Sequence, residues 1–306
     1  MTLPLHGCRV LDLGIITAGA ATGAMLADLG AEVIKVESPT YRDPFRNWNA
    51  ASAATDDGFR PFRFTNRNKE GISIDLKTPA GRDVFLELAR RSDIVVENFR
   101  RGVLEELGIG YDSLTAVRPG IILASISSQG ESGPKARYVS FGSTLEAMGG
   151  QAWHTGYDDA SGPVTTGRAL NYPDQVVALF ATGMVLAAYR QKRRTGQGAH
   201  LDLSQRELTS FLVGEEFAAA ESRPARAGNA DDGYFFQRCL RTQDGWMAVS
   251  IPGGQTPRVA ALIGEDDFTE DGLARWCAGE TAGTAAASLQ AIGVAAAPVL
   301  HGAEVR

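Results

Sequence analysis

Residues 8–37 read CRVLDLGIITAGAATGAMLADLGAEVIKVE, and this stretch decides the fold. The apolar, β-branched run Cys8–Leu13 predicts a buried strand, and Glu32–Val36 predicts a second one. Between them, Thr22–Leu29 has helical character, and Gly30 ends that helix. Because strand, helix and strand fit within 30 residues, the two strands are expected to pair in parallel through a right-handed crossover.

The same alternation continues over the first 130 residues of the chain. Thr78 and Pro79 open a further helix that runs to Arg91, with Thr78 as N-cap and Pro79 at the first helical position. A short helix is expected around Leu104–Leu107. Three more strands are predicted over Gly71–Leu76, Asp93–Glu97 and Ile121–Ser127. The predicted fold class is therefore α/β, with an open parallel sheet covered on both faces.

The second half of the chain is less regular. Residues 130–172 are rich in Gly, Ser, Pro and Tyr and predict a long, functional loop. An apolar helix from Asp174 to about Arg190 follows, then a strand over Ala199–Leu203 and a helix capped by Ser204 and Glu207. The expected organisation is a large domain (1–220), a polar linker (221–232) and a smaller α+β domain (233–306). In that domain, residues 243–250 contain a strand and 257–292 are helical.

Composition and charge exclude several classes of protein. The 306 residues carry a net charge of −6, which argues against a nucleic-acid partner. The longest apolar run, Val176–Tyr189, has 14 residues, whereas a membrane-spanning helix needs about 20. Three distant cysteines and four scattered histidines encode neither a disulfide framework nor a metal site. A soluble, cytoplasmic protein without membrane contact is expected.

The first loop of the crossover raises the question of a dinucleotide site. Its glycines, Gly14, Gly19 and Gly23, are spaced by five and four residues, whereas the pyrophosphate fingerprint is G-x-G-x-x-G. An ordinary structural crossover is therefore the preferred interpretation. The chain also has no P-loop motif and no G-x-S-x-G motif.

Two segments carry candidate chemistry. Asp174 lies where the irregular segment enters the apolar helix, so it is either an N-cap or a poorly hydrated nucleophilic carboxylate. Spacing alone favours the cap. Gly253 and Gly254 follow a predicted strand and form either a plain turn or a backbone oxyanion site. The plain turn is favoured, because most sequences of this kind form turns.

Five motifs occur in the order expected for one known family. They are Leu5–Leu13 (LHGCRVLDL), Leu26–Glu37 (LADLGAEVIKVE), Asn66–Lys69 (NRNK), Asp93–Phe99 (DIVVENF) and Arg194–Gly198 (RTGQG). Over Leu5 to about Val299 the chain thereby resembles the family III CoA-transferases, the CaiB/BaiF group. The resemblance implies a Rossmann-like large domain, a small second domain and an interlocked homodimer, or a heteromer with a related chain.

The resemblance also implies a reaction and a set of site residues. The substrates would be an acyl-CoA and a carboxylic acid acceptor, with no permanently bound cofactor and no metal. Asp174 matches the family's aspartate nucleophile, which forms an acyl anhydride and then an aspartyl-CoA thioester. Gly253, Gly254 and Gln255 resemble the glycine-rich loop that shields these intermediates. The implied CoA contacts are Asn98, Phe99, Arg137, Tyr138, Arg42 and Lys69.

The chain departs from the family pattern at several positions. Ala20 stands where a proline is common, and Ser38 where a basic residue is common, so that Arg42 is the candidate replacement for that charge. A second basic CoA contact is expected within Gly102–Gly108, but Glu105 and Glu106 occupy that stretch. The chain is also shorter than is usual in the family, as though it lacked the segment that returns to the large domain.

Two alternatives to CoA transfer follow from the same resemblance. One is 2-methylacyl-CoA racemisation, which needs a histidine opposite an aspartate. Its loop would fall near 138–147, where no histidine occurs, and His154 lies further on. The other is a catalytically weak CoA-binding subunit of a heteromeric transferase.

Overall fold

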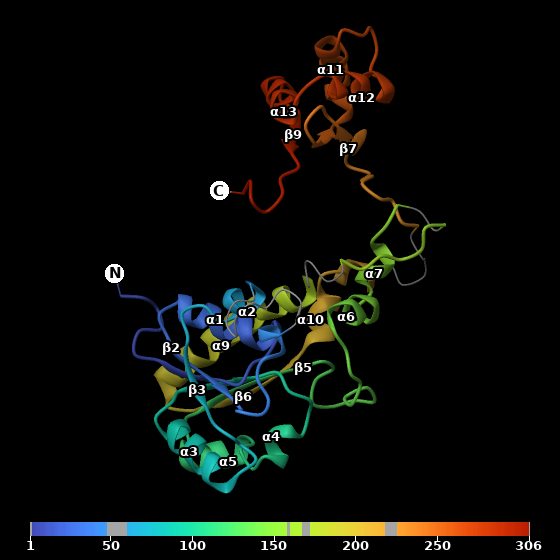
Figure 1. Cartoon of the computed structure of the whole chain (residues 1–306). Helices are drawn as coiled ribbons and strands as arrows, with labels where there is room; N and C mark the ends of the chain where they lie inside the picture. Colours follow the sequence, from blue (N-terminus) through green and yellow to red (C-terminus); the bar gives the residue numbers. More distant parts are fainter. Residues whose placement is uncertain (1, 48–59, 158–159, 167–171, 218–224, 306) are drawn as a thin grey trace. The chain divides into compact units, whose positions relative to one another are not determined.

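A computed structural model of the chain describes residues 2–47, 60–157, 160–166, 172–217 and 225–305 (Figure 1). It divides into two compact units. The sheet unit comprises Met1–Trp153 and Val164–Arg223, and the small unit comprises His154–Pro163 and Pro224–Arg306. Of the expected linker, residues 221–224 lie outside the described part of the chain.

The sheet unit is built on one six-stranded parallel sheet. Its strands are β1 (Arg9–Asp12), β2 (Glu32–Glu37), β3 (Glu70–Ser73), β4 (Ile94–Glu97), β5 (Ile122–Ser127) and β6 (Ala199–Ser204). Their order across the sheet is β3-β2-β1-β4-β5-β6, and every pair is parallel. This is the doubly wound arrangement, in which the chain moves first to one side of β1 and then to the other. The predicted fold class is confirmed.

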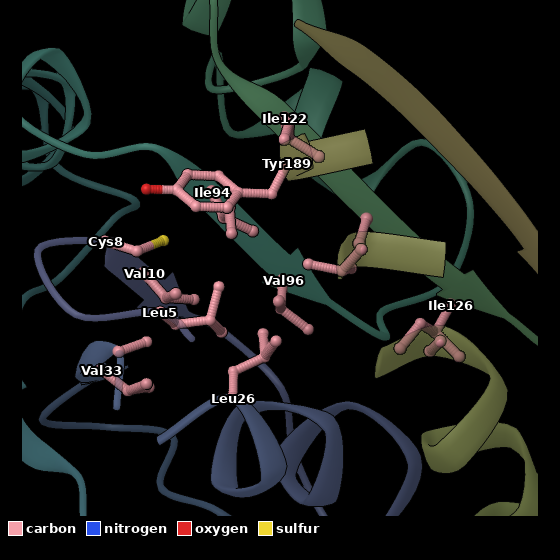
Figure 2. Close-up of a cluster of buried hydrophobic side chains, with 14 of the residues drawn as sticks. Leu5, Cys8, Val10, Leu26, Val33, Ile94, Val96, Ile122, Ile126 and Tyr189 are labelled. Atoms are coloured by element: carbon pink, nitrogen blue, oxygen red, sulfur yellow. The ribbon is translucent and has the colours of Figure 1, made fainter. Parts of the chain in front are cut away.

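Helices cover both faces of this sheet (Figure 1). On one face α1 (Ala18–Asp28) and α9 (Tyr172–Thr195) pack side by side. Figure 2 shows their side chains Leu26 and Tyr189 together with Val10 and Ile122 of the sheet.

A second core fills the other face of the sheet. Its helices are α3 (Pro79–Arg90), α4 (Val103–Glu106) and α5 (Tyr111–Val117). They bury Phe85, Leu104 and Leu114 against Leu11 and Leu123. Because successive strand residues point to opposite faces, both of which are covered, a strand such as β5 is buried along its whole length; all six of its residues are buried and four of them are apolar.

The element boundaries differ from the sequence predictions in instructive places. The segment predicted to be an irregular loop contains α6 (Gly142–Met148) and α7 (Gln151–His154). α9 begins at Tyr172, two residues before the predicted start, and α1 begins at Ala18, four residues early. The first residues of both helices lack a helical pattern of apolar residues, so the sequence did not predict these starts. Tertiary packing decides where the helices begin. The remaining elements here are η1 (Pro44–Arg46), α2 (Arg60–Thr65), α10 (Gln205–Phe211) and η2 (Gly214–Phe217).

The small unit has its own antiparallel sheet, β7-β8-β9. Its strands are β7 (Phe236–Arg241), β8 (Trp246–Ile251) and β9 (Ala295–Pro298). Its helices are η3 (Gly253–Gln255), α11 (Thr256–Ile263), α12 (Glu270–Ala278) and α13 (Ala282–Ala291). A separate core includes Met247, Val249 and Leu289. This agrees with the α+β character expected of the second part of the chain.

The predicted cap of α3 is confirmed and leads to a stability prediction. Thr78 Oγ1 accepts a hydrogen bond of 3.0 Å from the Gly81 N–H, and Pro79 occupies the first helical position. Thr78→Ala should lower the free energy of unfolding by about 1 kcal/mol, because it leaves this N–H without its cap. Urea denaturation measures the change. Thr115→Ala, inside α5, is the control that removes a half-buried threonine hydroxyl without removing a cap, and an equal loss there would contradict the assignment.

Among the described residues, no helix is both long and apolar enough to cross a membrane.

Candidate active site

A cleft of about 2080 Å³ opens at the carboxyl ends of the parallel strands of the sheet unit. Each strand contributes the segment that follows it: Ile15 after β1, Ser38 after β2, Asp75 after β3, Phe99 after β4, Ser128 after β5 and Gln205 after β6. The strand order reverses between β1 and β4, and such switch points leave a crevice in which α/β proteins bind their ligands. The cleft therefore lies where the fold itself favours binding.

Asp174 lines this cleft from the first turn of α9. It is the third residue of the helix, so its interpretation as an N-cap is wrong. The backbone N–H groups of Asp174 itself and of Ala18, the first residue of α1, act on this carboxylate by favouring its charged form. Oδ2 is buried and has no hydrogen-bond partner among the described residues. The first turns of two helices thus influence one carboxylate that has a free oxygen.

The electrostatics of Asp174 follow from this position. Burial raises the pKa of Asp174 from 3.8 to about 6, and the two backbone N–H groups partly oppose that rise. At neutral pH the carboxylate is ionised yet poorly hydrated. Such a group is a stronger nucleophile than a solvated one, because less water has to leave before it attacks.

Asn98 and Phe99, at the end of β4, also line the cleft. The Asn98 side chain is committed to the first loop: Oδ1 accepts from the Ile15 N–H at 2.7 Å, and Nδ2 donates to the Ile15 carbonyl at 3.0 Å. A Cβ on Gly19 would lie 2.6 Å from Asn98 Oδ1, so only glycine fits there. The glycine spacing that lacked a dinucleotide fingerprint thus serves this close packing.

Basic side chains line the cleft in greater number than the sequence suggested. Arg137 and Tyr138 are at its wall, as the resemblance implied. The lining basic residues that were missed are Arg60, Lys77, Arg100 and Arg101. Arg100 and Arg101 directly precede the stretch in which a basic contact was expected, and Arg101 pairs with Glu131 at 2.9 Å. Their position just beyond the carboxyl end of a central parallel strand was the signal that could have found them.

Two implied CoA contacts are not among the described residues that line the cleft. Arg42 is exposed beside it. Lys69 is buried, and its ammonium donates to Asp12 Oδ2 at 2.6 Å, Ala20 O at 2.7 Å and Asn66 Oδ1 at 2.9 Å. This set of partners gives Lys69 a structural role in place of the implied CoA contact, and burial lowers its pKa to about 8.

Gly253, Gly254 and His154 belong to the small unit, whereas Asp174 belongs to the sheet unit. Gly253 and Gly254 form η3 with Gln255, and no described atom lies close enough to clash with a Cβ on either glycine. Packing inside the unit therefore does not require glycine there. His154 ends α7, and no histidine is among the cleft residues that the structure describes.

The chain is thus an α/β protein with a doubly wound sheet and with a cleft that is lined by basic residues and by the Asp174 carboxylate. Comparison with known families names it: the model of CoA-transferase family III matches residues 5–306. The chain belongs to this family.

Curated relatives and solved structures agree. The chain is 34% identical to the succinyl-CoA:glutarate CoA-transferase of Mus musculus, over 85% of this chain and 59% of that protein. It is 32% identical to the succinate–glutarate CoA-transferase of Agrobacterium fabrum, over 88% of this chain and 68% of that one. A CaiB/BaiF family protein from Brucella suis has a TM-score of 0.88 at 29% identity, covering 100% of this chain and 86% of that chain. The chain thus spans little more than half the length of some relatives it matches.

Proposed function

We propose that this protein transfers CoA from an acyl-CoA to a carboxylic acid, with Asp174 as the covalent nucleophile. One observation carries the proposal: the Asp174 carboxylate lines the cleft with a buried oxygen that has no hydrogen-bond partner among the described residues. Family membership and relatives named as CoA-transferases support the reaction class.

The proposed reaction balances through two anhydrides and one thioester. Asp174 Oδ attacks the thioester carbonyl, the C–S bond breaks, and CoA leaves as the thiolate. The thiolate then attacks Cγ of Asp174 in the mixed anhydride, which releases the donor acid and leaves an aspartyl-CoA thioester. The acceptor carboxylate attacks the same Cγ and expels the thiolate again. Attack of the thiolate on the acceptor's carbonyl yields the new acyl-CoA and restores the carboxylate.

The cleft supplies the other requirements of this chemistry. The Ala18 N–H favours the ionised form of the carboxylate, while Oδ2 is free to attack. Arg100, Arg101 and Arg137 offer cations for the phosphates of CoA. Gly253 and Gly254 remain candidates for shielding the intermediates, because their backbone would allow close approach of a reacting carbonyl.

The partner is part of the proposal as well. A homodimer, or a heteromer with a related chain, is proposed from the family resemblance. One relative supports the second form by its name, the succinyl-CoA–L-malate CoA-transferase alpha subunit of Chloroflexus aurantiacus, at 36% identity over 218 residues.

Trapping the covalent intermediate tests the mechanism. Incubating the protein with succinyl-CoA and quenching with hydroxylamine should convert Asp174 to its hydroxamate, detected by peptide mass spectrometry. Succinyl-CoA is the probe because two relatives are named for succinyl or succinate transfer. Asp174→Asn should give no modified peptide. Turnover without a modified Asp174, or modification of another carboxylate, would show that the nucleophile is misassigned.

The pKa of Asp174 predicts the acid side of the activity profile. Because only the ionised carboxylate attacks, kcat/KM should be level above about pH 7 and fall about tenfold per pH unit below about pH 6. A profile measured between pH 5 and pH 8 with a saturating acceptor acid checks this. A kcat/KM that stays nearly level down to pH 5 would mean that Asp174 titrates as an ordinary solvated carboxylate.

The cleft arginines predict how CoA binding responds to charge removal. Arg100→Ala and Arg137→Ala should each raise the Kd for CoA about five- to tenfold, because each removes one charged contact to phosphate. Calorimetric titration at two salt concentrations measures this, and the loss should shrink at the higher concentration. Arg90→Ala, on the exposed surface of α3, is the matched control. An equal rise in the Kd for CoA in Arg90→Ala would show that the effect is not specific to the cleft arginines.

A further inference from the structure

The loop between β1 and α1 carries a feature that the proposed chemistry leaves unexplained. Ile16 has a φ of +59°. This left-handed conformation is strained for a β-branched residue and persists only where surrounding contacts impose it. Ile15, Ile16 and Thr17 line the cleft, so the strained residue belongs to the wall of the candidate site.

Buried side chains bind the backbone of this loop in sequence. Asp12 Oδ1 accepts the Gly14 N–H at 2.7 Å, and Lys35 Nζ donates to the Gly14 carbonyl. Asn98 binds both the N–H and the carbonyl of Ile15. These contacts restrict the backbone conformation of Gly14 and Ile15, the two residues that precede Ile16.

The contact at Ile16 comes from a buried ion pair. Asp43 Oδ1 accepts the Ile16 N–H at 3.1 Å, and Asp43 Oδ2 pairs with Lys35 Nζ at 3.0 Å. The two side chains are only 0% and 4% exposed. Burying two charges costs desolvation that apolar side chains would avoid, so stability alone does not account for such a pair.

Two residues beyond Ile16, α1 begins at Ala18, whose N–H favours the charged form of the Asp174 carboxylate, and Ile16, Thr17 and Asp174 line the same cleft. We infer that Lys35 and Asp43 are positioning residues that hold Ile16 in its left-handed conformation and thereby aim the Ala18 N–H at Asp174. The ion pair fixes the conformation of the loop, and the loop fixes the position of the first turn of α1. That turn in turn orients the Asp174 carboxylate. The effect of this arrangement on catalysis rests on the proposed function, whereas the arrangement itself does not.

Titration of Asp174 tests the inference without any substrate. In protein labelled with ¹³C at the aspartate carboxyls, Asp174 is assigned by comparison with Asp174→Asn. Asp43→Asn should raise the pKa of Asp174 by about half a pH unit or more, because the Ala18 N–H no longer stabilises the charged form. Lys192→Met is the control, since it breaks the Lys192–Asp93 pair (2.7 Å) just before β4, at the amino end of that strand.

A smaller rise in Asp43→Asn, or an equal rise in Lys192→Met, would overturn the inference. If Asp43→Asn does not fold, amide exchange in the unmodified protein decides. The Gly14–Ala18 amides should then exchange at least about 10³-fold more slowly than in an unstructured peptide, and faster exchange would also overturn it. Both measurements are independent of CoA, so they stand even if no Asp174 adduct forms.

Discussion

Asp174→Asn should reduce kcat/KM for CoA transfer by at least about 10³-fold. The amide has nearly the same shape as the carboxylate but cannot form the anhydride, so the loss should fall on the chemical step. Acyl-CoA binding should change little, because phosphate contacts come from elsewhere in the cleft. Steady-state kinetics with succinyl-CoA, together with the Kd for CoA, separate the two effects. Retention of full turnover would rule out covalent catalysis by Asp174.

The same variant carries its own folding control. Because burial raises the pKa of Asp174 to about 6, folding disfavours its ionised form. The stabilising contribution of the neutral acid is complete below about pH 4 and is lost as the pH rises through 6. Asp174→Asn should therefore have the wild-type Tm at pH 4 and a higher Tm at pH 8. A lower Tm at pH 8 would mean that the activity loss reflects misfolding.

Lys69→Met should lower the free energy of unfolding by about 3 to 5 kcal/mol. Its ammonium and the Asp12 carboxylate are 1% and 0% exposed and lie 2.6 Å apart, so removing the cation leaves a buried, unpaired charge. Urea denaturation measures the change.

Arg67→Met is the matched control for that prediction. Arg67 stands two residues away and also pairs with an aspartate, Asp28, but both side chains are about one third exposed. Exposed pairs contribute about 0 to 1 kcal/mol, so this variant should be nearly neutral. Equal effects of the two substitutions would show that Lys69 acts as a surface residue, open to a ligand.

Much of the fold was predictable because parallel strands buried on both faces leave a continuous apolar signal. β1, β4 and β5 were found to within a residue or two for this reason. β7 and β9 were missed, since β7 alternates polar and apolar residues at low contrast and β9 is a run of alanines with no β-branched residue. Short helices such as α6 fell below the length at which periodicity can be recognised.

The residues of the candidate site also divide into those that the sequence predicts and those that it does not. Asn98 and Phe99 lie in a motif and Asp174 matches the family's aspartate by its position, and all three line the cleft. The buried pairing of Lys69 with Asp12 could not be predicted, because a lysine in a motif looks the same in the sequence whether it contacts solvent or a buried carboxylate. No local pattern reveals that Asp43 and Lys35 meet beneath the first loop, because Lys35 lies in β2 and Asp43 lies in the irregular segment that follows it.

The buried charges beneath the loop contribute little to the electrostatic potential around the cleft. Lys35, Lys69, Asp12 and Asp43 contribute two positive and two negative charges in two close pairs. Their potentials cancel over a short distance, so this cluster neither attracts nor repels an approaching polyanion. Long-range steering then falls to the arginines at the wall of the cleft, such as Arg100 and Arg137. Rising ionic strength should slow the arrival of CoA while leaving the geometry around Asp174 untouched.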